Sequence, residues 1–306
     1  MRTRQLVPSS DVEKETGFGK DLLRKWRQRY GFPISEATPD GKVGFSQETI
    51  SRLLLIKRLL EDGFRPAQVV GKPPQELDYL RQALADEVPV PRWSEATSRL
   101  MDRVKETDFE GLERLLTIDR TKRTLTAFVL NTLVPLVGAI GESWKRGEIE
   151  VFHEHICSGI IARTLHVEIL TTKPKSGFPR ILFATPPEED HVLGLLMAEA
   201  VFADQGAKTL SAGSNTPLNG LRAAAMSCRV NVVALSFSFA FAARRVRPTL
   251  VHLRQLLPPD IQVWAGGAGA AILKRPPKGV RVFTDFQEAG AALHDLVRQK
   301  SRRPQA

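Results

Sequence analysis

The sequence predicts a multidomain protein of α and α/β class, in which two helical regions precede a parallel sheet covered by helices. Three observations predict this fold. Residues 1–72 combine short amphipathic helices with turn signals, and residues 93–172 keep a helical period with few strand signals. Residues 180–299 alternate strands with helices, which is typical of a parallel sheet. The stretch 73–92 contains four prolines and is predicted to be a linker around a short helix at residues 76–85.

The composition is that of an ordinary globular protein. The chain has 306 residues, of which 42% are hydrophobic and 25% charged, and this length suits two or three domains. Its longest apolar stretch, residues 128–140, is broken by Asn131 and Pro135, so we expect a core helix there and no membrane span. The first residues lack the apolar segment of a secretory signal, and Cys157 and Cys228 stand far apart. Both observations favour a cytoplasmic protein without disulfides.

The first region is predicted to hold four helices and a small hairpin. The first helix is stopped by Gly17, and the second covers residues 20–30. Thr38-Pro-Asp-Gly41 is a turn signal between two short extended stretches, as a wing requires. A helix over residues 47–61 has a regular apolar face, and a short helix follows Pro66.

The second of these helices is strongly basic. It contains five cations and one acid, and residues 1–75 hold 14 Lys and Arg against 9 Asp and Glu within a chain of net charge +10. A helix in the major groove needs cations for phosphates and guanine edges, although a charged helix face can also simply be solvated. The predicted DNA contacts are Lys20, Arg24, Lys25, Arg27 and Arg29 in the helix and Lys42 in the wing.

Residues 16–33 resemble the start of MerR-family winged helix-turn-helix regulators, and the order of elements from Asp11 to Val70 follows that family. The resemblance implies binding to double-stranded operator DNA. Gly41-Lys-Val-Gly-Phe45 departs from the family, whose wing commonly has an Arg and a Tyr. Activators of the family follow the head with a long dimerisation coiled coil, whereas a Pro-rich stretch follows here. We therefore expect dimerisation in the C-terminal two-thirds of the chain.

Residues 93–172 are predicted to form a four-helix bundle, and residues 180–299 a Rossmann-like parallel-sheet domain. The bundle helices are expected near residues 93–105, 108–117, 122–146 and 149–171. The strands are expected at residues 180–185, 208–212, 232–238, 262–265 and 280–284. The helices between and after them are expected at residues 192–204, 217–228, 243–257 and 286–299.

Ligands of such sheets bind beyond the carboxyl ends of the strands, and polar or small residues stand there in this sequence. Glu189 and His191 follow the first strand, Ser236 and Ser238 end the third, and Gly266 and Gly267 end the fourth. The strand period also places Phe237, Phe239 and Phe241 on one face, where we expect them to fill the core. The small residues on the opposite face would leave room for a bulky ligand.

The pattern Glu189-x-His191-x-x-Gly194 resembles the cobalamin-binding Rossmann-like module, with a glutamate in place of the aspartate of many corrinoid enzymes. The resemblance implies that His191 is the lower axial ligand of cobalt and that Glu189 orients its ring. Gly194 and the Gly266–Gly267 pair would let the backbone approach the nucleotide tail. Without the surrounding pattern, His191 would be taken for a surface residue in the first turn of a helix.

Trp144, Glu154 and His155 form the second group of candidate residues. On one continuous helix Trp144 and His155 would lie about 16 Å apart, but Lys145-Arg146-Gly147 is a helix stop that brings them back together. With the bundle they resemble the cap of CarH/LitR-type photoreceptors, which implies that they enclose an adenosyl group on cobalt. The alternative is a core tryptophan beside a partly exposed acid and histidine. Zinc binding by His153 and His155 is not expected, because side chains two residues apart on a helix diverge.

Lys145 is a departure from these photoreceptors. At this position light-sensing relatives often have a histidine that ligates cobalt once light expels the adenosyl group. A lysine is normally protonated and is a poor ligand. The adenosylcobalamin-bound dark state is therefore expected to be intact. After illumination, His153 or a water molecule would have to replace the missing histidine ligand, or the light response would be altered.

Together these features predict a cobalamin-dependent, light-responsive transcriptional repressor. It would bind operator DNA in the dark as a dimer or tetramer loaded with adenosylcobalamin, and release the DNA when light breaks the cobalt–carbon bond. The alternative is a light-independent corrinoid-sensing or cofactor-free MerR-type regulator, which Lys145 favours. A corrinoid enzyme is not expected, because the chain combines a DNA-binding head with no substrate barrel.

Overall fold

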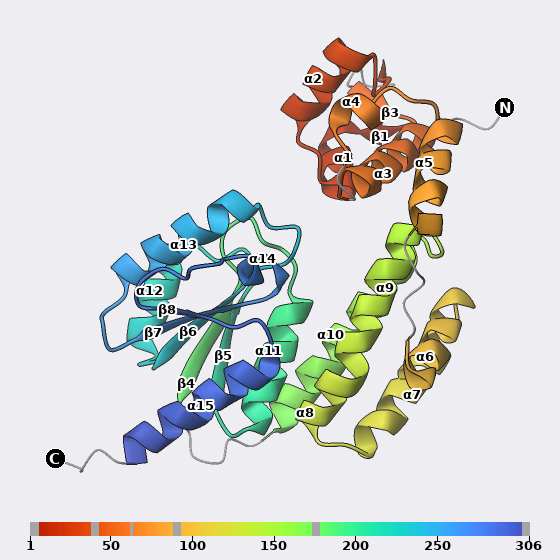
Figure 1. Ribbon diagram of the computed structural model, residues 1–306. Helices are drawn as coiled ribbons and strands as arrows, with labels where there is room; N and C mark the ends of the chain where they lie inside the picture. The colour runs from red at the N-terminus through yellow and green to blue at the C-terminus, as the bar shows by residue number, and fades with distance from the viewer. Residues whose placement is uncertain (1–5, 38–42, 62–63, 88–92, 173–177, 302–306) are drawn as a thin grey trace. The chain divides into compact units, whose positions relative to one another are not determined.

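The computed structural model describes residues 6–37, 43–61, 64–87, 93–172 and 178–301. The chain divides into two compact units (Figure 1). Residues 1–92 form the first unit and, apart from the short stretch 145–148, residues 93–306 form the second. Each unit is described by itself.

The first unit has five helices and a small antiparallel sheet among its described residues. Its elements are β1 (Val7–Pro8), α1 (Ser9–Thr16), α2 (Lys20–Tyr30), β2 (Glu36–Ala37), β3 (Val43–Phe45), α3 (Gln47–Glu61), α4 (Pro66–Val69) and α5 (Pro74–Glu87). The sheet order is β1-β3-β2, and Glu36 pairs with Gly44 across the predicted wing. Gly17 and Gly31, with φ of +74° and +71°, end α1 and α2 in the left-handed conformation that glycine adopts without strain. Winged helix-turn-helix architecture is therefore confirmed.

Helix α5 occupies most of the stretch that was predicted to be a linker. It packs on α3, and its Leu77 is fully buried in the core of the first unit, together with Trp26 and Leu53. A helix was predicted here at residues 76–85, and the observed helix is longer because it begins at Pro74, in the first turn, where proline is tolerated.

The second unit begins with the helical bundle. Its helices are α6 (Glu95–Lys105), α7 (Phe109–Thr121), α8 (Leu125–Phe128), the π-helical turn η1 (Val129–Leu133), α9 (Val134–Arg146) and α10 (Val151–Thr171). Ser94, Asp108 and Thr124 cap the helices after them by accepting hydrogen bonds from backbone N–H groups three residues further on.

The third predicted helix is continuous from Leu125 to Arg146 and contains the π-helical turn. Thr132 in this turn donates a hydrogen bond of 2.5 Å to Asp119 of α7. By length and composition this helix could also cross a membrane. In this structure its apolar side chains, such as Leu133 and Leu136, are buried in the bundle core, which is the place that the sequence predicted for them.

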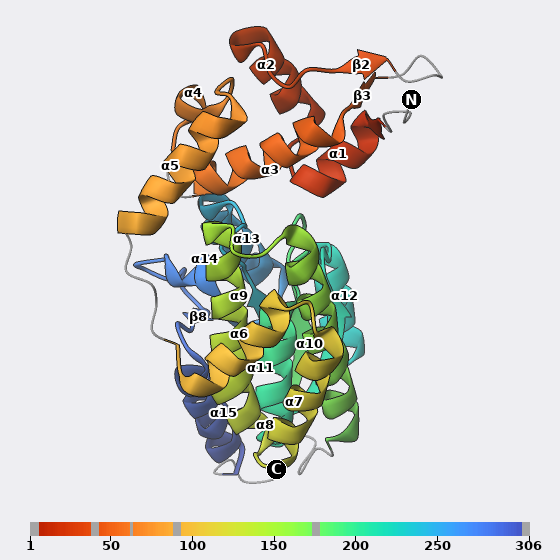
Figure 2. The same ribbon diagram turned by 90° about the vertical axis from the view of Figure 1, so that its right-hand side faces the viewer.

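The bundle is followed by a five-stranded parallel sheet of order β5-β4-β6-β7-β8. Its elements are β4 (Arg180–Ala184), α11 (Leu193–Asp204), β5 (Lys208–Gly213), α12 (Leu218–Ser227), β6 (Val232–Ser236), α13 (Ala243–Leu256), β7 (Gln262–Gly266), α14 (Ala268–Ala271), β8 (Val280–Val282) and α15 (Phe286–Ser301). Helices α11 and α15 cover one face, and α12 and α13 cover the other (Figures 1 and 2). The predicted Rossmann-like order of strands and helices is confirmed.

Helix α11 joins the sheet to the bundle. It packs along α10, and Leu196, Met197 and Ala200 of α11 belong to the same buried cluster as the bundle residues (Figure 2). The second unit therefore has a continuous apolar core from the bundle to the sheet, and α11 is the element that both share.

The predicted C-terminal end of the third strand was wrong. Strand β6 ends at Ser236, and the residues after it leave the sheet to pack against α14, where Gly269 donates its N–H to the carbonyl of Phe237. Phe237 and Phe241 are buried with ring centroids 5.2 Å apart, but Phe239 is 61% exposed. The alternation of a strand does not apply to a loop, so Phe239 does not fill the core as predicted.

Candidate functional site

The loops at the carboxyl ends of β4 and β6 bring Glu189, His191 and Ser238 together. We call these three residues the histidine-loop cluster. One carboxylate oxygen of Glu189 lies 2.7 Å from Nδ1 of His191 and accepts the backbone N–H of His191 at 3.0 Å. The other accepts the backbone N–H of Ser238 at 2.8 Å, and the Ser238 hydroxyl lies 3.3 Å from the same Nδ1. The carboxylate thus ties both loops to the imidazole ring.

Glu189 is ionised in this environment. Only 1% of the residue is exposed, and burial by itself opposes the charge, but the hydrogen bonds from His191 and Ser238 outweigh burial and hold the pKa of Glu189 below its ordinary value. An ionised carboxylate favours the tautomer in which Nδ1 of His191 carries the proton. A histidine held in this way ligates a metal through Nε2. The His191 side chain is 60% exposed, so the donor set fits an axial ligand of cobalt.

Glycines shape the loops around this cluster. A Cβ at Gly194, in the first turn of α11, would lie 3.3 Å from the hydroxyl of Ser236 at the end of β6. Gly267 has φ of +89°, and a Cβ there would lie 2.3 Å from the carbonyl oxygen of Phe237. Gly267 is therefore required by close packing of its loop, while a Cβ at Gly266 would meet only a carbonyl 4.0 Å away.

Sequence reasoning missed Gly269. A Cβ at this position would lie 2.4 Å from the carbonyl oxygen of Ser238, so Gly269 lets α14 approach the loop that carries Ser238. The signal was present in the run of small residues from Ala265 to Ala271. The sequence does not show which glycine of this run is needed, because only the fold shows which of them approaches the backbone of another segment.

Trp144, Glu154 and His155 lie on the bundle, and we call them the bundle cluster. Helix α9 ends at Arg146, Gly147 has φ of +69°, and α10 begins at Val151, so the predicted turn between the two helices is confirmed. Trp144 is partly buried against the bundle core. Glu154 accepts a hydrogen bond of 2.8 Å from Ser158 and lies 3.2 Å from Nδ1 of His155, whose side chain is 74% exposed.

His153 caps the start of α10. Its Nδ1 accepts the backbone N–H of Glu150 at 3.1 Å, which caps α10, and its ring stacks on Phe152 at 3.9 Å. The residue is buried, with Phe109 of α7 at 6.1 Å between ring centroids. The imidazole of His153 is thus engaged in the helix cap in this structure, and its role as a replacement cobalt ligand after illumination stays a prediction. Among the described residues no three His, Cys, Asp or Glu side chains are grouped to hold a metal ion.

Helix α2 presents its cations to solvent. Leu23 and Trp26 are buried in the head, whereas the predicted DNA contacts at positions 20, 24, 25, 27 and 29 are exposed. Arg27 donates a hydrogen bond of 2.7 Å to Ser35, and Arg24 pairs with Asp21 at 3.2 Å. The predicted wing contact, Lys42, lies outside the described residues.

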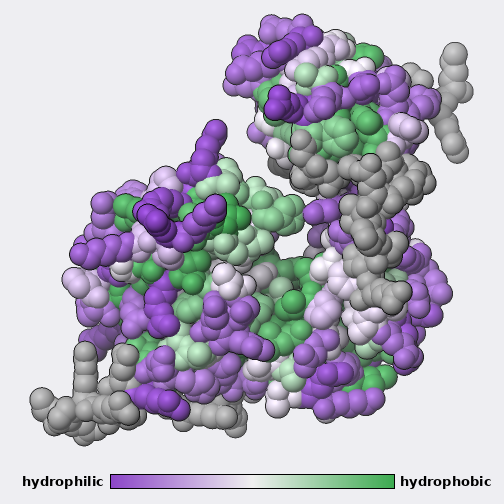
Figure 3. Space-filling model, in the orientation of Figure 1, coloured by the Kyte–Doolittle hydropathy of each residue, from purple (hydrophilic) through white to green (hydrophobic). Residues whose placement is uncertain are grey.

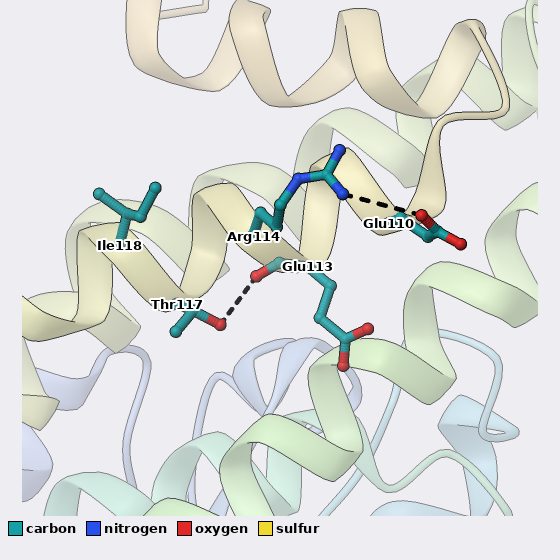
Figure 4. A pocket seen from close by; sticks show the side chains of 5 residues that line it. All are labelled: Glu110, Glu113, Arg114, Thr117 and Ile118. Atoms are coloured by element: carbon teal, nitrogen blue, oxygen red, sulfur yellow. Dashed lines mark hydrogen bonds and ion pairs between the residues drawn. The ribbon is translucent and has the colours of Figure 1, made fainter.

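A cavity of about 470 Å³ lies on α7 (Figure 4). Its described lining comprises Glu110, Glu113, Arg114, Thr117 and Ile118. Arg114 pairs with Glu110 at 3.7 Å, and Thr117 donates to the carbonyl of Glu113. These are ordinary contacts of an exposed helix face, and the cavity contains none of the predicted site residues.

Two protein families and several known proteins match this chain. Residues 7–72 match the MerR HTH family of regulatory proteins, and residues 97–167 match the B12 binding domain. The HTH-type transcriptional repressor CarH of Myxococcus xanthus is 30% identical over 264 residues, which cover 83% of this chain and 86% of CarH. The chain belongs to the CarH family of MerR-type transcriptional repressors.

Other relatives agree with this assignment. The HTH-type transcriptional repressor CarA of the same organism is 27% identical over 300 residues, covering 96% of this chain and 98% of CarA. The monomethylamine corrinoid protein of Methanosarcina barkeri shares the fold, with a TM-score of 0.52 and 14% identity, over 64% of this chain and 96% of its own. As a member of the CarH family, the chain is a cobalamin-binding regulator.

Proposed function

We propose that this chain is a light-responsive repressor that uses adenosylcobalamin. In the dark, the loaded protein binds operator DNA in the cytoplasm as a dimer or tetramer, and light releases it. The observation that carries the proposal is the histidine-loop cluster, in which the buried carboxylate of Glu189 lies 2.7 Å from Nδ1 of the exposed His191 and favours a proton on that nitrogen. This is the arrangement that a histidine ligand of cobalt requires.

Residues of both modules would hold the cofactor. His191 would ligate cobalt, and Gly194, Ser236 and Gly266 would contact the nucleotide tail. Trp144 would stack on the adenosyl group, while Glu154 and His155 would form hydrogen bonds with it. When bound, the cofactor supplies a cobalt–carbon bond that light can cleave.

Helix α11 supports a mechanical link between the clusters. Val192, next to His191, packs against the bundle core, and α11 continues along α10, which carries Glu154 and His155. A shift of the bundle after loss of the upper group would therefore act on the same packed core that positions His191. Such a shift would change the surface available for self-association, and with it the affinity for operator DNA.

The proposal is tested by loading the purified chain with adenosylcobalamin in darkness. Absorption spectra, size-exclusion profiles and binding to DNA fragments from the source genome are then compared before and after green light. We expect a larger species that binds DNA in the dark and a smaller one after light. A chain loaded with hydroxocobalamin, which has no alkyl group on cobalt, is the matched control and should not respond. Loss of the cofactor during purification, or equal profiles in dark and light, would contradict the proposal.

Lys145 supports a second candidate, a corrinoid-sensing repressor that does not respond to light. It follows Trp144 in the last turn of α9, where light-sensing relatives often have a histidine. We predict that Lys145→His gives the illuminated, cobalamin-loaded protein an absorption spectrum that differs from that of the illuminated wild type, because an imidazole can ligate cobalt and a protonated amine cannot. Arg146→His, one residue further on, is the control. Identical spectra for all three proteins would contradict this role of position 145.

A further inference from the structure

The positive charge of the chain is concentrated in its sheet domain. Residues 173–306 hold 18 Lys and Arg against 9 Asp and Glu, a net charge of +9, while the bundle, residues 93–172, holds 10 against 12. The DNA-binding head therefore accounts for only part of the basic character. Within the sheet domain, residues 243–279 contain seven cations and a single acid, Asp260.

Five of these cations form one exposed surface, which we call the α13 patch. Its members are Arg244, Arg247, Lys274, Arg275 and Lys278, all exposed to solvent. Arg247 donates a hydrogen bond of 2.6 Å to the carbonyl of Arg275, which holds the loop before β8 against the N-terminal half of α13. Further along, a Cβ at Gly279 would lie 3.1 Å from Cδ of Arg254. The loop thus runs beside α13, and the cations of both segments line one strip.

The patch belongs to α13 and the loop before β8, on the face of the sheet that α12 also covers. Val246, Leu250 and Leu253 of α13 are buried with α12 on one face of the sheet, while α11 and the bundle pack on the other. Hydrophilic side chains gather over α13 in Figure 3. Among the described residues, Glu188 forms an ion pair with Arg245 beside the patch, and no carboxylate forms one with the five patch residues. Their charge is therefore available to a partner.

We propose that the α13 patch is a second contact surface for duplex DNA, separate from the head. A duplex presents one phosphate charge per roughly 1.7 Å of its axis, so neighbouring cations of the patch can each meet a phosphate. Lysine and arginine side chains bind the phosphate backbone of DNA without reading bases. The patch would therefore add affinity and salt dependence but no sequence preference. Because the head is on the same chain, a DNA molecule bound there is at high effective concentration for the patch.

The surface fits a duplex better than other polyanions. Proteins that bind single-stranded nucleic acid combine cations with aromatic side chains on which bases stack, and the patch has no aromatic member. A helix that lies on an anionic membrane inserts an apolar face, whereas Val246, Leu250 and Leu253 of α13 are buried against the sheet.

The test is the salt dependence of binding to a labelled 40-base-pair duplex of arbitrary sequence. Fluorescence anisotropy is measured with the full chain between 50 and 300 mM salt. The variant Arg244→Glu, Lys274→Glu, Lys278→Glu is compared with a control of equal charge change on the bundle, Arg99→Glu, Arg114→Glu, Lys122→Glu. Loss of three phosphate contacts lowers the slope of log K against log salt by about 2.7. The control should lower it far less, and circular dichroism should show that both variants are folded.

A slope that is unchanged in the patch variant, or lowered equally by the control, would overturn the proposal. So would patch-dependent binding to a 40-nucleotide single-stranded RNA, or to vesicles containing phosphatidylserine, without an effect on the duplex. A chain with Arg24→Ala, Lys25→Ala and Arg27→Ala in the head should keep weak duplex binding, and adding the patch substitutions should remove it. The cofactor is not needed in these measurements, so their outcome is separate from that of the light experiment.

Discussion

At the scale of single residues, the candidate site depends on one buried charge. Glu189 is held by hydrogen bonds from three groups of His191 and Ser238, and those bonds keep it ionised despite its burial. The carboxylate in turn favours the tautomer of the exposed ring that carries a proton on Nδ1. The role proposed for His191 therefore depends on its buried neighbour.

We predict that Glu189→Gln weakens retention of cobalamin about 10- to 100-fold, because a neutral amide holds the tautomer and the ring less firmly. Equilibrium dialysis against cobalamin measures the change. Glu189→Asp keeps the charge and should recover much of the affinity. Equal retention by the Gln variant and the wild type would show that the carboxylate does not orient the ligand.

Gly267 gives a second prediction at this scale. Gly267→Ala should destabilise the second unit by more than the roughly 1–3 kcal/mol expected for backbone strain, because the new Cβ would also meet the carbonyl oxygen of Phe237 at 2.3 Å. Gly213→Ala is the matched control, since φ is +77° but no atom lies within 4 Å of the added Cβ. Urea unfolding measures both. A Gly267 variant no less stable than the Gly213 variant would contradict the packing described for this loop.

At the scale of elements, local signals predicted most of the chain. Helix α2 begins and ends at the predicted residues, and the five strands of the large sheet lie within two residues of their predicted positions. Glycine stops and periodicity are local properties, so the sequence alone contains them. The failures have tertiary causes. Helix α5 is held by burial of Leu77, and Phe239 is exposed because packing of α14 ends β6 early.

Helix α5 gives the prediction at this scale. Leu77→Ala should lower the free energy of unfolding of the first unit by about 2–5 kcal/mol, because the side chain is fully buried in its core. Tyr79→Ala, at a position 74% exposed on the same helix, should change it by less than about 0.5 kcal/mol. Thermal denaturation of the full chain, with loss of DNA binding as the readout for the first unit, measures the effect of both substitutions. If the two substitutions cost the same, α5 is not part of the head.

At the scale of the whole molecule, the candidate residues fall into two clusters on two modules that share α11. The sequence could identify Glu189, His191 and Ser238, because loops at the carboxyl ends of neighbouring parallel strands meet at one edge. It could not find the contact of Gly269, because the carbonyl of Ser238 that Gly269 approaches is distant in sequence. It also could not place the α13 patch, since net charge does not show which face carries it.

The central claim, that His191 binds cobalt, is tested most directly by electron paramagnetic resonance. The chain is labelled with ¹⁵N-histidine, loaded with cobalamin and reduced to the Co(II) state. If a protein histidine is the axial ligand, the nitrogen splitting changes from the triplet pattern of ¹⁴N to the doublet pattern of ¹⁵N, and His191→Ala loses this labelled signal. A triplet pattern that persists in the labelled wild type would show that the ligand is not a histidine of the protein, and would contradict the account.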